Sequence, residues 1–132
     1  MADFPPLECT KIVYRTVFRK EWIRKDGSFK WQMFKPYRND QIGVSVFIEP
    51  KDIEDHPETP CFGVASVHVG KVRDCSNNEF TLDVVQDKTW HGNITGIPFH
   101  YLENDLEETE IAERMRDCCE ALRDNASRPY NP

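Results

Sequence analysis

The arrangement of apolar and polar positions predicts two strands in the first half of this chain. The segment Lys11–Phe18 is rich in β-branched and aromatic residues, and Arg15 lies between two valines on one of its faces. The segment Gln41–Ile48 has an apolar residue at every second position and places Ser45 on the opposite face. We expect two strands here, each with one polar residue in a notable position.

The middle of the chain has the pattern of a β-hairpin. Apolar and polar residues alternate in Phe62–Arg73 up to Gly70. After Gly70 the apolar positions are shifted by one residue, which is typical of a β-bulge. Asp74–Asn78 is a cluster of turn residues, and Glu79–Val85 alternates again. We therefore predict an antiparallel hairpin of these two strands, and a last short strand within Thr89–His100.

Helical patterns are clearest near the end of the chain. Leu106–Arg123 carries apolar residues at helical spacing, with acidic residues early and an arginine late. Pro50–Asp55 and Glu21–Lys25 each predict a short helical turn, whereas Phe29–Phe34 predicts a short strand or an extended connector.

Together these elements predict one α+β domain over residues 1–132, with an N-terminal arm at 1–10 and a loose tail at 125–132. The fold is expected to be a mostly antiparallel, strongly bent sheet, or two small sheets, with one long C-terminal helix and short helical turns. No run approaches the roughly 20 apolar residues of a membrane span, and the N-terminus lacks a signal-peptide pattern. We expect a soluble, cytoplasmic protein that does not interact with membranes.

Cysteine and histidine positions argue against disulfides and against a metal site. Five cysteines are an odd number without paired spacing, which favours small buried side chains in a reducing compartment. The gaps between His56, Cys61, His68 and Cys75 are 5, 7 and 7 residues, unlike the closely spaced ligand pairs of zinc sites. We expect no metal ligand.

Charge is divided unevenly along the chain. Residues 1–40 contain nine Lys and Arg against five Asp and Glu, yet the whole chain has a net charge of −6. An acidic protein is a poor general binder of nucleic acid. The basic half is therefore better suited to a small anionic ligand or a protein partner.

Three polar residues on predicted strands could carry chemistry. Arg15 could hold a phosphate with its planar fork, Ser45 could bond a ribose, and His91 could act as a general base. Tyr14 and Asn93, which adjoin this set, are further candidates for ligand binding. The structural alternatives are an arginine whose stem covers the core, a solvent-facing serine and a histidine in a glycine turn.

The order of these residues carries a resemblance. The stretches "VYRTVFRKEW", "DGSFKWQMF", "GVSVF" and "WHGNITGIPF", within residues 12–98, resemble a group of small, largely uncharacterised bacterial proteins. More distantly they resemble the ADP-ribosyltransferase fold, which implies that Arg15 contacts NAD, that the strand of Ser45 supports the site, and that the protein is an effector of a bacterial conflict system. The late strand offers His91 and Asn93 where that superfamily has a glutamate, and "GVSVF" is not Ser-Thr-Ser. A related fold that binds an NAD-like nucleotide without the usual transfer is also consistent with the resemblance.

A second class of function is a non-catalytic protein-interaction module. Its docking face would be the basic N-terminal half with Trp22, Trp31, Phe34 and Arg24, or the acidic C-terminal helix. The alternative for the three aromatic residues is packing in the core. The sequence alone supports either an enzyme or a binding protein.

Overall fold

The computed structural model describes residues 4–36, 43–58, 60–100, 106 and 108–126. In this part of the chain five strands form one open antiparallel sheet, in the order β3-β1-β2-β5-β4. The predicted α+β class is confirmed. The strands are β1 (Ile12–Val17), β2 (Val44–Phe47), β3 (Gly63–His68), β4 (Asp83–Lys88) and β5 (His91–Thr95).

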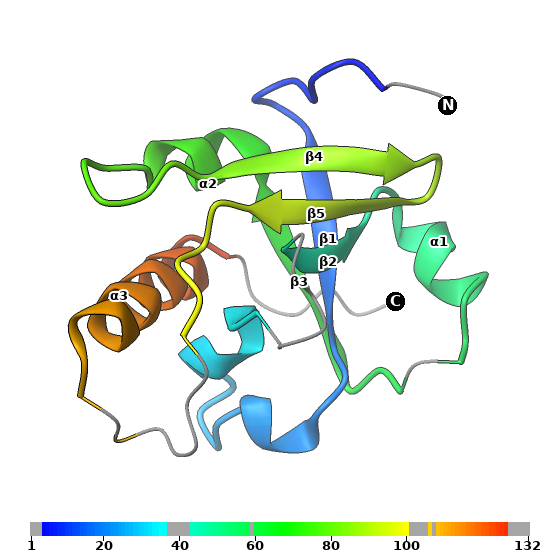
Figure 1. The fold of residues 1–132 in the computed structure, drawn as a ribbon. Coiled ribbons are helices and arrows are strands. Elements are labelled where there is room, and N and C mark those ends of the chain that lie inside the picture. Colours follow the sequence, from blue (N-terminus) through cyan, green and yellow to red (C-terminus); the bar gives the residue numbers. More distant parts are fainter. Residues whose placement is uncertain (1–3, 37–42, 59, 101–105, 107, 127–132) are drawn as a thin grey trace.

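The sheet is strongly twisted, and helices and turns surround it. In Figure 1 the β4–β5 hairpin crosses the direction of β1 and β3 steeply, as a strongly bent sheet requires. The described helical elements are the short turns η1 (Lys20–Trp22) and η2 (Trp31–Phe34) and the helices α1 (Pro50–Glu54), α2 (Val69–Asp74) and α3 (Glu110–Asn125).

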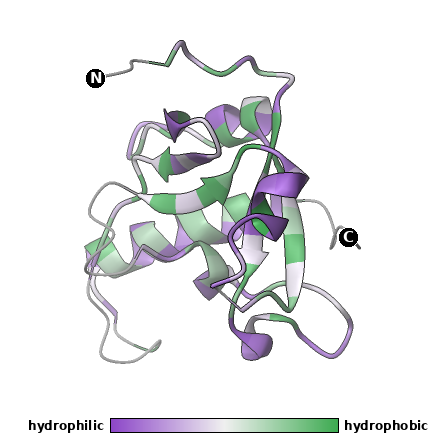
Figure 2. Ribbon diagram, turned by 90° about the vertical axis from the view of Figure 1, so that its right-hand side faces the viewer, coloured by the Kyte–Doolittle hydropathy of each residue, from purple (hydrophilic) through white to green (hydrophobic). Residues whose placement is uncertain are grey.

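One face of the sheet packs into the main core. Val13 and Val17 of β1 and Val44 and Val46 of β2 are almost fully buried, which confirms the apolar faces read from their alternation. Figure 2 shows hydrophobic and polar residues alternating along the strands and along α3. The buried stripe of α3 consists of Ala112, Met115, Cys118, Cys119 and Leu122.

The C-terminal helix closes this core against η2. The Sγ of Cys119 lies 3.3 Å from the Phe34 carbonyl oxygen, so the helix and the turn are in direct contact. The helix begins later than the predicted Leu106, because the Thr109 hydroxyl caps it by accepting a hydrogen bond from the Ala112 amide at 3.1 Å. Of the expected tail, residues 127–132 lie outside the described residues, and so do 41 and 42 of the second predicted strand.

The predicted hairpin of Phe62–Arg73 with Glu79–Val85 is wrong. β3 pairs with β1 at one edge of the sheet, whereas β4 pairs with β5 at the other edge. The phase slip at Gly70 marks the start of α2, because Val69 and Val72 are buried at helical spacing. Gly70 also packs closely on the N-terminal arm, since a Cβ there would lie 2.8 Å from the Cys9 carbonyl oxygen.

The prediction of an extended Phe29–Phe34 is also wrong. Residues Trp31–Phe34 form a 3-10 turn instead, and Trp31, Met33 and Phe34 are all buried. A single turn can bury three large side chains on the core, which an alternating strand with one solvent face could not do.

All five cysteines are free thiols. Cys118 and Cys119 are buried, as expected of small apolar side chains, but Cys9 and Cys61 are exposed, which the sequence interpretation did not anticipate. Burial raises the pKa of the Cys118 thiol to about 12 and that of Cys119 well above its ordinary value. The helix cysteines are therefore unreactive in the folded state.

Candidate functional site

The second face of the sheet carries polar and aromatic residues around β2 and β5. These strands are antiparallel, with Phe47 opposite His91 and Ser45 opposite Asn93. Because residues directly opposite each other project on the same side, these four side chains share one face. This is the face opposite to that of the buried residues Val44 and Val46.

A cleft of about 350 Å³ lies at this part of the protein. It contains three residues that the sequence singled out, namely Arg15, Ser45 and His91. The remaining lining residues are Thr16, Phe18, Phe47, His56, Glu58 and Trp90. The structure thus brings the three predicted residues to one cleft, although their side chains play different parts in it.

Arg15 acts mainly as a structural clamp behind the cleft. It is only 4% exposed. Its Nε and Nη2 donate to the Met33 carbonyl oxygen at 3.1 and 3.0 Å, and its Nη1 donates to the Ser45 carbonyl oxygen at 3.0 Å. The guanidinium also lies 5.2 Å from the centre of the Phe18 ring. Its planar fork is thus engaged by backbone, where the sequence suggested a bound phosphate.

His91 is held in place by Asp87 from the same hairpin. The pairs Gln86–Gly92 and Lys88–His91 leave Asp87 as the extra residue of a β-bulge. The bulge lets the Asp87 carboxylate reach His91, with Oδ1 2.7 Å from the imidazole Nδ1. The other carboxylate oxygen accepts a hydrogen bond from the Asn93 amide at 3.1 Å. Asn93, predicted to bind ligand, therefore orients Asp87.

The same contacts keep Asp87 ionised. Burial alone would raise the pKa of Asp87, but the hydrogen bond and charge of His91, with the Asn93 amide, hold that pKa below its ordinary value. A carboxylate on one ring nitrogen fixes the tautomer and the orientation of an imidazole. His91 consequently presents a defined second nitrogen.

His56 and Trp90 complete the wall of the cleft, and the sequence interpretation did not select either. Their rings stack at a centroid distance of 3.8 Å with an interplanar angle of 23°. The Lys88 ammonium lies 5.0 Å from the centre of the Trp90 ring. Trp90 belongs to the two-residue turn between β4 and β5, and His56 follows α1, so neither occupies a position that periodicity can identify.

The end of α1 positions His56. Pro50 starts this helix, as predicted, and Glu49 and Asp52 form a reciprocal capping box at its beginning. The short helix leaves carbonyls without intrahelical partners at its end. The Asp52 carbonyl oxygen accepts a hydrogen bond from the Nδ1 of His56 at 2.7 Å. This bond holds the imidazole, which lines the cleft.

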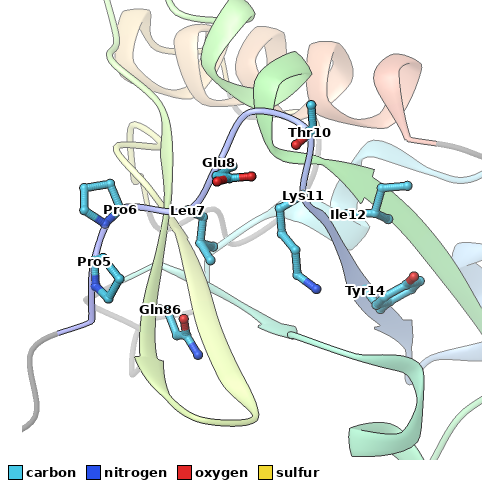
Figure 3. A pocket seen from close by; sticks show the side chains of 9 residues that line it. All are labelled: Pro5, Pro6, Leu7, Glu8, Thr10, Lys11, Ile12, Tyr14 and Gln86. Carbon is cyan, nitrogen blue, oxygen red and sulfur yellow. The ribbon is translucent and has the colours of Figure 1, made fainter.

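Tyr14 lines a different hollow from Arg15. That groove, of about 640 Å³, lies between the N-terminal arm and the sheet, and Lys11, Ile12 and Gln86 also line it. Figure 3 shows the groove beside the β4–β5 hairpin. Tyr14 is therefore not part of the cleft that contains His91.

The expected aromatic docking face is absent from the surface. Trp22 and Trp31 are 4% and 9% exposed, and Phe34 is fully buried. These rings fill the core around η1 and η2, which confirms the alternative of core packing and not the exposed docking face. Arg24 is exposed and lines a small hollow together with Ser28 and Arg123.

The described residues contain neither a membrane-spanning helix nor a cluster of metal ligands. No described helix has both the length and the apolar character needed to traverse a bilayer. Across the same residues, no group of three or more His, Cys, Asp and Glu side chains is arranged to hold a metal ion.

The fold and the cleft define an α+β protein with a histidine- and aromatic-lined cleft on an antiparallel sheet. In comparisons with known proteins, no family model, no curated protein and no solved structure matches this chain. Function must therefore be argued from the cleft.

Proposed function

We propose that the cleft binds a ligand of mononucleotide size. Its volume of about 350 Å³ lies at the lower end of the range of roughly 300–1,000 Å³ typical of small-molecule sites. One nucleoside with its phosphate is suited to such a space, whereas an entire dinucleotide such as NAD would extend beyond it. NAD thus remains a ligand to be tested, with one half in the cleft and the other outside.

The observation that carries this proposal is the mixed lining of one cleft. Phe47 and the stacked pair of His56 and Trp90 offer apolar ring surface for a base. Ser45 and Glu58 line the same space with groups that bond sugar hydroxyls. An aromatic wall with a few convergent polar groups is the usual composition of a small-ligand site.

The charges near the cleft are compatible with a phosphate. The Lys88 ammonium lies beside Trp90, and the Arg15 guanidinium lies behind Ser45. Arg15 contributes through its field, since three of its nitrogens donate to backbone carbonyls. Glu58 and Asp87 oppose this positive charge, which favours a singly esterified phosphate over a triphosphate.

Thermal unfolding with a panel of nucleosides, the four ribonucleoside monophosphates and NAD tests the proposal. A ligand present at 100 times its dissociation constant stabilises the folded state by about 2.7 kcal/mol. For a chain of this size that raises Tm by roughly 8–11 °C. We expect a monophosphate to give the largest shift, and the absence of a shift with every compound would refute the proposal.

Glu58 provides a matched pair of variants. Glu58→Gln keeps the size of the side chain and removes the charge from the cleft, whereas Glu54→Gln makes the same change on the exposed surface of α1. We expect isothermal titration to show a changed affinity for the monophosphate only in Glu58→Gln. Equal affinity in both variants would place the ligand elsewhere on the protein.

A further inference from the structure

Two histidines of the cleft are anchored through the same ring nitrogen. His56 Nδ1 lies 2.7 Å from the Asp52 carbonyl oxygen, and His91 Nδ1 lies 2.7 Å from the Asp87 carboxylate. A carbonyl and an ionised carboxylate only accept hydrogen bonds, so each Nδ1 carries the proton and donates it. In both rings Nε2 is therefore the nitrogen that can exchange a proton with a ligand.

The two imidazoles belong to one rigid wall. Trp90 stacks on His56 at 3.8 Å and meets His91 edge-on at 5.3 Å. Phe47 lies 5.8 Å from the His56 ring and 6.5 Å from the His91 ring. Both histidines line the same cleft, although one follows α1 and the other begins β5. Their packing fixes both rings before any ligand binds, which is what proton transfer requires.

We propose that His56 and His91 form a general acid–base pair that cleaves ribonucleotide phosphodiesters at this cleft. This inference rests on the proposed nucleotide binding and adds a reaction to it. A base and an acid without an activated protein nucleophile suit a substrate that carries its own nucleophile. The 2′-hydroxyl beside the phosphate of a ribonucleotide is such a nucleophile.

The proposed step balances in atoms and charge. His56 Nε2 takes the proton of the 2′-hydroxyl, and the 2′-oxygen forms a bond to phosphorus. The bond from phosphorus to the 5′-oxygen of the next nucleotide breaks, and His91 Nε2–H gives its proton to that oxygen. The products are a 2′,3′-cyclic phosphate and a free 5′-hydroxyl, and no oxidant, reductant or second substrate takes part.

The partners of the two rings determine their roles. The Asp87 carboxylate places a negative charge beside His91. His91 is therefore suited to be the general acid, the member of the pair that carries the proton before transfer. His56 donates to the neutral Asp52 carbonyl and stacks on Trp90, which suits the member that accepts a proton. Asp87 is then a positioning residue that acts through His91.

Substrates with different leaving groups separate the two roles. Dinucleoside monophosphates have a poor leaving group that needs a general acid, whereas nucleoside 3′-(p-nitrophenyl) phosphates have one that leaves without protonation. We expect His56→Ala to slow cleavage of both substrates by roughly 10²–10⁴-fold. His91→Ala should slow only the dinucleoside reaction to that extent, and His100→Gln, a histidine outside the cleft, should leave both rates unchanged.

The remaining controls make each outcome decisive. A 2′-deoxy substrate should not react, and the wild-type rate should be bell-shaped in pH. Asp87→Asn should reduce kcat more than it raises KM and should move one limb of that profile. Circular dichroism and monophosphate titration confirm that each variant is folded and binds.

Three results would overturn the inference. If monophosphates bind but no ribonucleotide ester is cleaved, the acid–base pair is refuted while the binding proposal stands. If His56→Ala, or a variant that carries both His56→Ala and His91→Ala, cleaves at the wild-type rate, the activity belongs to other residues or to a contaminant. If neither binding nor cleavage occurs, both proposals fail together.

Discussion

Replacing Arg15 by methionine tests whether this arginine clamps the sheet to the turn beside it. The substitution retains most of the buried stem but removes the guanidinium, which donates to the carbonyl oxygens of Met33 and Ser45. Near this residue β1 and β2 pair at Tyr14 and Phe47. The Arg15 side chain therefore supplies one hydrogen bond to the Ser45 strand in addition to those of the backbone ladder, and two to Met33 in η2.

The expected loss can be worked out from these contacts. A buried acceptor that loses its donor costs about 1–3 kcal/mol, and two carbonyls are affected, which gives about 2–6 kcal/mol. Removing a buried charge recovers part of this cost, because the guanidinium no longer has to be desolvated. We expect Arg15→Met to lower the free energy of unfolding by about 2–4 kcal/mol, with a Tm lower by roughly 6–16 °C.

Urea denaturation followed by tryptophan fluorescence and circular dichroism measures this change. Arg24→Met is the matched control, since Arg24 is exposed, and it should change the free energy of unfolding by no more than about 0.5 kcal/mol. An Arg15→Met variant as stable as wild type would refute the structural role. If that variant also lost monophosphate binding, the guanidinium would be assigned to ligand recognition instead.

Three further predictions concern the helix, the thiols and pH. Thr109→Ala removes the side-chain cap of α3 and should cost about 1 kcal/mol in urea denaturation, whereas an unchanged midpoint would show that the cap contributes nothing. Cys118 and Cys119 should resist alkylation until the protein unfolds, while exposed Cys61 reacts at once, as mass spectrometry of labelled peptides can show. Because the folded-state pKa of Asp87 is lowered, its stabilising effect is present above its ordinary pKa of 3.8 and is lost as pH falls through the lower folded value. Wild type should therefore lose more stability than Asp87→Asn when urea midpoints are compared from pH 5 downward, and parallel curves would contradict this.

The elements that the sequence predicted well are those set by local rules. The β-branched and aromatic residues of Lys11–Phe18 predicted a strand, and β1 forms there with Val13 and Val17 buried. Pro50 starts α1 as expected of a proline at a helix N-terminus. In α3 the spacing of Met115 and Leu122 is helical, although Ile111, which the same spacing places on the stripe, is 49% exposed.

The partners of the strands could not be predicted from the sequence of any single segment. β3 and β4 follow each other in sequence with a turn cluster between them, so an adjacent hairpin was the simplest interpretation. The helix α2 intervenes, and each strand pairs with a different partner at opposite edges of the sheet. Such non-local pairing depends on which faces the whole chain must bury, and one segment does not contain that information.

For the cleft, too, local sequence patterns identified some residues, whereas their contacts depend on how the strands pair. The order of Arg15, Ser45 and His91 on predicted strands led us to expect a shared cleft, and all three residues line one. Their local patterns did not indicate that the Arg15 guanidinium donates to the Ser45 carbonyl oxygen. His91 reaches the cleft because β5 pairs with β2, and its orientation depends on the bulge at Asp87. The chemistry that we propose for the cleft thus rests on His56 and His91, with Asp87 beside the latter, while Arg15 bonds the strand on which Ser45 lies.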